Sequence, residues 1–191
     1  MRTRILSIAS LLCLSTLFFF CKKDTNQIEE SPFLEFFKES SITIDTVTLS
    51  ADIWEYGFEF TPLKSGKVTQ FGVKIPSNGD FFVTLWDLSG PTPVALRSKI
   101  VTNSVLNESS SSDIEAVTLQ KGGRYGLTVM SNAFYRITRP GNAVFAFPRT
   151  IGNIRIESFN EGVNNSGFAT FPDTTNDTRV APCVDVIFIA E

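Results

Sequence analysis

The stretch that decides the fold is Trp54–Phe60, whose sequence is WEYGFEF. Its four aromatic residues occupy alternate positions, and Glu55, Gly57 and Glu59 fill the positions between them. Successive side chains of a β-strand point to opposite faces of a sheet, so this alternation predicts a strand with one buried face. A stripe of four aromatic residues is more typical of a core than of a sugar-binding platform. The stretch therefore predicts a β-rich domain with an aromatic core.

Strand patterns separated by turn signals continue on both sides of this stretch. Pro76–Asp80 and Ser89–Pro91 are turn-rich, and no long segment has the 3.6-residue period of a helix. The other predicted strands are 42–49, 67–75, 81–87, 94–101, 114–119, 125–129, 134–138, 144–147, 151–159 and 180–190. Short strands separated by turns predict an all-β fold, an antiparallel sandwich or barrel.

The beginning of the chain has the layout of a lipoprotein signal. Arg2 and Arg4 precede the apolar run Ile5–Phe20, which is shorter than the roughly 20 residues of a membrane-spanning helix. The run ends at Cys21, in a context that resembles a relaxed lipobox and the mature start of lipoproteins from the Bacteroidota. We expect residues 1–20 to be a signal peptide and Cys21 to be lipidated. An uncleaved N-terminal anchor and an ordinary secretory signal are the alternatives.

The remaining chain is expected to form one domain behind a tether. Residues 21–40 are predicted to be the lipidated cysteine and a tether, and residues 41–191 the β-sandwich. Within the first range, Pro32–Glu39 could form one amphipathic helical turn or pack against the sandwich. With Cys13 in the leader and Cys21 lipidated, Cys183 has no partner for an intrachain disulfide, and we expect a small buried side chain there.

Composition excludes several classes of function. The net charge is −3, and removal of the two leader arginines makes it more negative, which disfavours nucleic-acid binding. The chain has no histidine, which excludes Ser-His-Asp and Cys-His catalysis, histidine-containing zinc sites and haem held by histidine. Carboxylate-only catalysis and oxygen-ligated calcium remain open. The carboxylates considered for such catalysis are Asp80, Asp87, Asp113, Glu115 and Asp185.

Seven short motifs, in order, resemble the bacterial family called domain of unknown function 4082. They are Phe58–Thr61, Ser65–Thr69, Phe71–Lys74, Val83–Asp87, Val117–Leu119, Lys121–Tyr125 and Val184–Phe188. The resemblance covers about 52–191 and departs at Ser77–Phe81, where the family has a longer polar loop. It implies a jelly-roll-like antiparallel β-sandwich of the kind found in secreted and surface proteins. The family has no established function, so the resemblance implies no binding residues.

Two groups of residues are candidates for ligand binding. Trp86 is predicted on the face of its strand opposite Val83, where it could stack on a sugar ring or lie under a loop. Tyr135, Arg136 and Arg139 combine an aromatic surface with fixed donors, which suits polyols or carboxylates. An edge strand protected by positive charge is the other interpretation of these three residues, and the one we favour.

The polar segment 160–177 is a candidate for binding a ligand or calcium. It is rich in amide and carboxylate oxygens but lacks the regular spacing of a calcium loop, so a solvated loop is the simpler interpretation. We expect no metal or cofactor, with structural calcium left open.

These features predict a lipid-anchored protein of the cell envelope, placed in the outer membrane and facing the periplasm or the outside. We expect a non-catalytic binding module, with carbohydrate as the favoured ligand. The alternative is a structural or protein-interaction subunit of an envelope assembly, and a glycan-active enzyme is the third possibility. The expected partners are the membrane, through the lipid anchor, and a glycan or an envelope protein.

Overall fold

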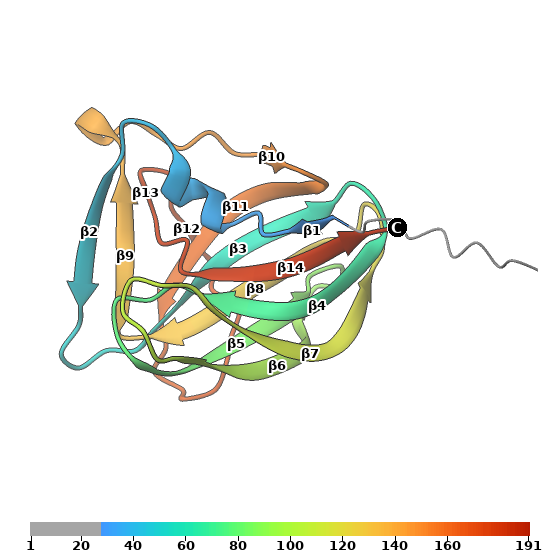
Figure 1. Cartoon of the computed structure of the whole chain (residues 1–191), viewed down its shortest axis with the longest axis horizontal. Coiled ribbons are helices and arrows are strands. Elements are labelled where there is room, and N and C mark those ends of the chain that lie inside the picture. The colour runs from blue at the N-terminus through green and yellow to red at the C-terminus, as the bar shows by residue number, and fades with distance from the viewer. Residues whose placement is uncertain (1–27) are drawn as a thin grey trace, which may run out of the picture.

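The computed structural model describes residues 28–191, which form two large antiparallel sheets packed face to face and a small third sheet (Figure 1). The first large sheet has the order β1-β14-β4-β7, with β1 (Glu29–Glu30), β14 (Val184–Ala190), β4 (Gly66–Val73) and β7 (Ser110–Leu119). The second has the order β10-β11-β3-β8-β5-β6, and β12 also pairs with β11. Its strands are β10 (Arg149–Ile151), β11 (Ile154–Val163), β3 (Trp54–Pro62), β8 (Tyr125–Ser131), β5 (Gly79–Asp87), β6 (Val94–Asn103) and β12 (Thr174–Thr175).

The third sheet lies at one end of the sandwich and has the order β13-β9-β2 (Figure 1). Its strands are β13 (Arg179–Val180), β9 (Ala133–Thr138) and β2 (Thr43–Thr48), and two short 3-10 helices, η1 (Leu34–Lys38) and η2 (Pro140–Asn142), complete the fold. The predicted all-β, antiparallel sandwich is therefore confirmed. Among residues 28–191, the helices are too short to cross a membrane.

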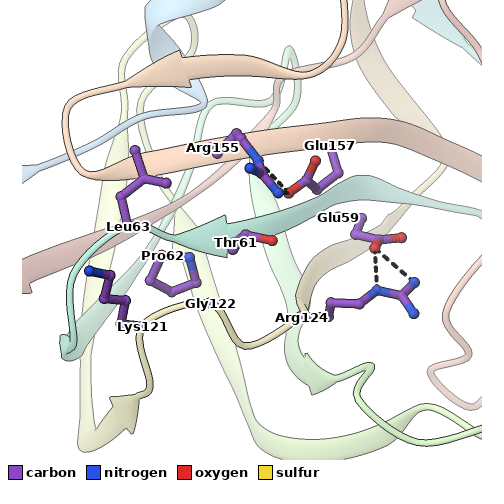
Figure 2. Close-up of a pocket in the computed structure, with 9 residues that line it drawn as sticks. All are labelled: Glu59, Thr61, Pro62, Leu63, Lys121, Gly122, Arg124, Arg155 and Glu157. Atoms are coloured by element: carbon purple, nitrogen blue, oxygen red, sulfur yellow. Dashed lines mark hydrogen bonds and ion pairs between the residues drawn. The ribbon is translucent and has the colours of Figure 1, made fainter.

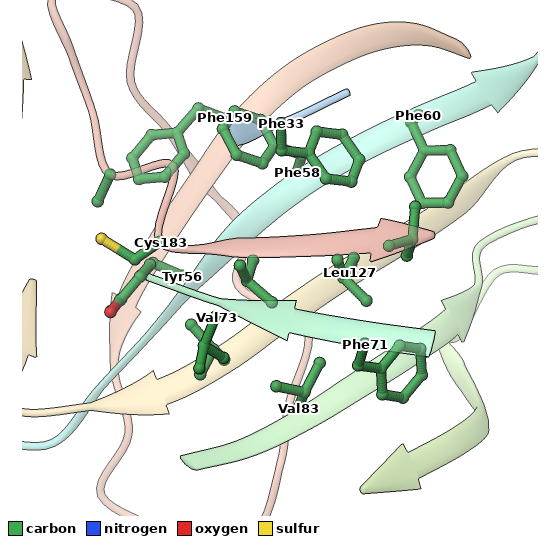
Figure 3. Close-up of a cluster of buried hydrophobic side chains, with 14 of the residues drawn as sticks. Phe33, Tyr56, Phe58, Phe60, Phe71, Val73, Val83, Leu127, Phe159 and Cys183 are labelled. Carbon is green, nitrogen blue, oxygen red and sulfur yellow. The ribbon is translucent and has the colours of Figure 1, made fainter. Parts of the chain in front are cut away.

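The aromatic stripe of β3 lies at the centre of the core, as its alternation predicts. Tyr56, Phe58 and Phe60 are at most 1% exposed and face the side chains of the four-stranded sheet (Figure 3). Phe58 also contacts Phe159 of the neighbouring strand β11, with 5.4 Å between the ring centroids. Because β3 pairs with β11 on one side and β8 on the other, the whole second sheet is organised around it.

The N-terminal segment belongs to the domain, which begins well before the predicted boundary at residue 41. Phe33 and Phe36 are fully buried, and Phe33 stacks on Phe58 with 4.7 Å between centroids and 4° between the planes. The carboxyl of Asp185 on β14 accepts the backbone N–H groups of Phe33 and Leu34 at 3.2 and 3.0 Å. These contacts make residues 29–39 part of the sandwich, whereas the earlier part of the expected tether lies outside the described residues.

Three local predictions are corrected or confirmed by strand pairing. Ser110–Asp113 was expected in a loop but forms the start of β7, because these polar residues pair with β4 and face solvent. Val144–Phe147 was expected to be a strand but has no ladder partner, although Phe145 is buried. Ile187 and Ile189 continue the apolar character of the last strand on its second face, which predicts a strand that is covered on both sides or central; β14 lies inside its sheet, between β1 and β4.

Candidate functional site

A pocket of about 520 Å³ that is lined by charged and apolar residues opens on the outer face of the second sheet, and we call it the β3–β11 pocket (Figure 2). It lies where β3 and β11 run side by side, and the turn between β7 and β8 forms its rim. Its lining residues are Glu59, Thr61, Pro62, Leu63, Lys121, Gly122, Arg124, Arg155 and Glu157. Two carboxylates, two guanidinium groups and one ammonium group therefore surround one cavity.

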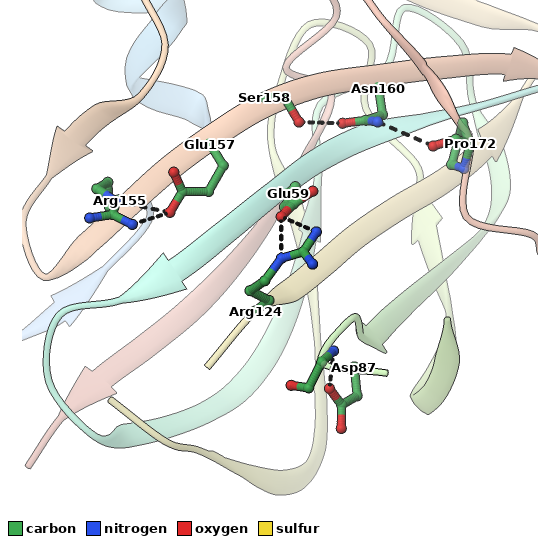
Figure 4. A network of polar contacts seen from close by, with 9 residues as sticks. Glu59, Asp87, Arg124, Arg155, Glu157, Ser158, Asn160 and Pro172 are labelled. Carbon is green, nitrogen blue, oxygen red and sulfur yellow. Dashed lines mark hydrogen bonds and ion pairs between the residues drawn. The ribbon is translucent and has the colours of Figure 1, made fainter. Parts of the chain in front are cut away.

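Two arginine–glutamate pairs dominate the pocket (Figures 2 and 4). Arg124 donates through Nε and Nη2 to Oε1 of Glu59, at 2.9 and 2.8 Å. Arg155 donates in the same way to Oε1 of Glu157, with both distances 2.8 Å. In both pairs the arginine contacts Oε1 of the glutamate, and Oε2 takes no part in these contacts.

The strand pattern explains why these side chains face outward. Glu59 and Thr61 follow the polar alternation of β3, whose other positions enter the core. On β11 the register shifts between Ile156 and Ser158, so Glu157 is an extra residue opposite β3. Such a bulge leaves one residue unpaired and redirects the neighbouring side chains. Alternation from the buried Ile156 places Glu157 on the outer face beside Arg155, and the bulge returns Phe159 to the core.

The rim of the pocket depends on the turn between β7 and β8. Gly122 has φ of +76°, a conformation that favours glycine, and its N–H donates to the carbonyl of Pro62 at 2.9 Å. This bond joins the turn to the end of β3. Lys121 and Arg124, on either side of the two glycines, are thereby held over the pocket.

The pocket offers hydrogen-bond donors and acceptors at close range. A glycosidase uses one carboxyl in apolar surroundings as a proton donor beside a second, ionised carboxylate. Here each carboxylate is bonded to a guanidinium, the opposite of apolar surroundings. Hydroxyl groups of a ligand, which both donate and accept, would find partners on both residue types.

Trp86 is on the predicted outer face of its strand, but the expectation of an exposed stacking platform is wrong. Its side chain is only 5% exposed because the loop after β11 covers it, and Phe171 of that loop meets it edge-on at 6.4 Å. The indole Nε1 donates to Thr128 Oγ1 at 2.8 Å, and Thr128 donates to Glu55 at 2.7 Å. Trp86 is thus a buried contact beneath a loop, which was the alternative interpretation.

Glu55 is the group that fastens this loop to the sheet. It is 2% exposed and accepts the Asn164 amide at 2.9 Å and the Thr170 backbone N–H at 2.6 Å. Burial raises the pKa of this carboxyl, and the bonds from the loop and from Thr128 act against that rise. The long loop is therefore built onto a buried carboxyl.

Tyr135, Arg136 and Arg139 all lie on or after β9 but do not form one site. Tyr135 is 7% exposed, packs edge-on against Phe37 at 5.7 Å, and donates from its hydroxyl to the Asn107 side chain. Arg136 pairs with Asp45 on β2 at 2.9 Å. Arg139 lines a second pocket, which is separate from the β3–β11 pocket. The edge-strand interpretation is also wrong, because β9 pairs with β2 on one side and β13 on the other.

The polar side chains of segment 160–177 largely form hydrogen bonds with one another or with adjacent residues of the same chain. Asn164 contacts the Phe168 carbonyl, and Asn176 accepts the backbone N–H groups of Thr178 and Arg179. Within residues 28–191, no group of three acidic or cysteine side chains is arranged to hold a metal ion.

Sequence reasoning did not find the β3–β11 pocket. The alternation of β3 places Glu59 on the outer face, which was a usable signal. Its partner Arg124 lies 65 residues away, and no local pattern connects the two. None of the five carboxylates considered for catalysis lines the pocket.

Comparison with known proteins found no matching family model, no matching curated protein and no matching solved structure. The resemblance to domain of unknown function 4082 therefore stays a prediction.

Proposed function

We propose that this chain is a lipid-anchored cell-envelope protein whose β-sandwich is a non-catalytic binding module for carbohydrate. The observation that carries the proposal is the β3–β11 pocket, in which two arginine–glutamate pairs surround one cavity. Its volume of about 520 Å³ falls in the range of small-ligand sites, roughly 300–1,000 Å³. The pocket thus has the size of a small-ligand site.

The chemistry of the pocket favours a polyol among small ligands. A sugar hydroxyl can donate to Oε2 of Glu59 or Glu157 while accepting from an arginine. Charge-assisted bonds of this kind are stronger than neutral ones. Thr61 and Lys121 add further polar groups, and Pro62 and Leu63 add apolar surface for the C–H face of a ring.

The anchor is supported by the sequence of the leader, which lies outside the described residues. A basic start, a short apolar run and Cys21 at its end are the features a lipoprotein signal needs. Stable anchoring generally takes more than one acyl chain, as on a multiply acylated cysteine. We propose that the domain is held at the outer membrane, facing the periplasm or the outside.

A second candidate function is a protein-interaction subunit of an envelope assembly. Strand β6 lies at the edge of the second sheet. Ile100 of this strand is 51% exposed and lies opposite Phe82, which is 39% exposed. Beside its contacts with β7, which include the Arg97–Glu115 pair, this strand presents exposed apolar side chains against which another protein can pack.

A glycan array probed with the full chain, purified in detergent, tests the proposal. We expect binding to at least one polysaccharide, and Glu59→Gln should weaken it about tenfold, because a charge-assisted bond is lost. Glu115→Gln is the matched control, since Glu115 also pairs with an arginine but is 80% exposed and lies outside the pocket. If no glycan binds, or Glu59→Gln binds as well as the control, the β6 interface becomes the better account.

A further inference from the structure

A second pocket, of about 590 Å³, lies between the segment after η1 and the connection from β9 to β10. We call it the two-arginine pocket, because Arg139 and Arg149 line it together with Glu39. Ser40, Ser41 and small apolar residues complete its walls. It shares no lining residue with the β3–β11 pocket.

Aromatic rings hold both guanidinium groups in place. Arg139 lies over the ring of Phe145, with its Cζ 4.6 Å from the centroid, and Arg149 lies over Phe36 at 4.8 Å. Both rings are buried, and their centroids are 6.0 Å apart. A guanidinium stacked on a fixed ring loses little further freedom when it binds a ligand. The two arginines are therefore arranged before any ligand arrives.

One glutamate lies between the two arginines and leaves an excess of positive charge. Arg139 donates to Oε2 of Glu39 at 2.5 Å, and Arg149 donates to Oε1. The Glu39 side chain is 10% exposed, whereas each arginine is 31% exposed, so the guanidinium groups form the more accessible surface. Two cations and one anion line the pocket, and the arginines stay protonated at any physiological pH.

The partial burial of Arg149 also favours the binding of an anion. It lowers the pKa of Arg149 from its usual value, while the negative charge of Glu35 acts in the opposite direction. Glu35 is itself paired with Lys38 at 2.5 Å. A partly buried cation in this position gains when a further anion approaches.

We propose that the two-arginine pocket binds the anionic group of an acidic saccharide, a carboxylate or a sulfate. Planar guanidinium groups match such oxyanions through paired N–H donors. Ser40 and Ser41 are exposed beside them and offer hydroxyl groups to the rest of the sugar. This inference does not rest on the β3–β11 pocket, which would bind neutral hydroxyl groups.

The simpler alternative is that Glu39 and the two arginines only tie the segment after η1 to the β9–β10 connection. That tie is present in either case, so structural stability alone does not separate the two. A measurement of anion binding separates the two interpretations. If the arginines only bind Glu39, the pocket has no affinity for an added oxyanion.

Titration calorimetry with the full chain in detergent tests the proposal. The probes are trigalacturonate, its neutral methyl ester and a sulfated disaccharide. We expect at least one anionic probe to bind, with an affinity that falls as the salt concentration rises. If trigalacturonate is the probe that binds, its methyl ester should bind at least tenfold more weakly. Arg139→Gln should weaken anion binding about tenfold or more, and Arg139→Lys less.

Two controls keep the result interpretable. Arg97→Gln changes an arginine that also pairs with a glutamate but lines neither pocket, and it should leave anion binding unchanged. Thermal unfolding of Arg139→Gln shows whether the variant is folded; if it is not, Arg139→Lys carries the test. Failure of both anionic probes to bind would overturn the proposal. So would equal binding of the methyl ester and the acid without sulfate binding, or loss of binding in Arg97→Gln.

Discussion

At the scale of single residues, Asp185 connects the N-terminal segment to the core. Its carboxyl is 1% exposed and accepts three backbone N–H groups, from Phe33, Leu34 and Val186. Burial raises the pKa of this carboxyl to about 7, and the three hydrogen bonds offset only part of the rise. The folded protein therefore holds a proton at this position that the unfolded chain releases near pH 4.

This carboxyl makes stability depend on pH in a direction opposite to that of most acidic groups. As pH rises from about 4 to about 7, the unfolded chain ionises first, so the free energy of unfolding should fall, on the order of 4 kcal/mol. Below about pH 4 the effect disappears, and above about pH 7 it is constant. Urea unfolding at pH 4, 5.5 and 7.5 should show this component in the wild type and not in Asp185→Asn. Parallel pH profiles for the two proteins would refute it.

At the scale of elements, the segment that contains β1 and η1 is a structural part of the sandwich. Phe36 is fully buried and stacks on Phe58 with 5.4 Å between centroids. Phe36→Ala should lower the free energy of unfolding by about 3–5 kcal/mol, because it empties a packed core position. Phe168→Ala is the control, since Phe168 is 79% exposed and should change stability by less than about 0.5 kcal/mol. Similar urea midpoints for both variants would show that the segment is only a tether.

The alternation of side chains made most strands predictable, because a half-buried strand alternates apolar and polar residues along the sequence. It gave β3 and β5 nearly to their ends, and it put Trp86 on the correct face. It could not show that a distant loop covers that tryptophan, since Phe171, 85 residues later, meets it only through tertiary packing. Short elements such as β1 have too few residues for any period, so the start of the domain was placed too late.

At the scale of the whole molecule, the β3–β11 pocket lies at the end of the sandwich where the chain enters it. Strand β1, the end of β14 and the turns that border the pocket gather there (Figure 1). Glu30 accepts the Asn153 N–H at 2.6 Å, and Asn153 accepts the Leu63 N–H at 2.8 Å. From Cys21 to Glu29 the chain can span at most about 28 Å. With Cys21 acylated, a glycan in this pocket would be kept close to the membrane.

We propose that one molecule is both anchored by Cys21 and able to bind a glycan. The most direct test compares glycan binding in membrane and soluble fractions of cells that express the wild type or Cys21→Ser. We predict that binding resides in the membrane fraction of the wild type and moves with the protein to the soluble fraction of Cys21→Ser. Binding that stays with the membranes in Cys21→Ser would contradict the anchor, and absence of binding from all fractions would contradict the binding module.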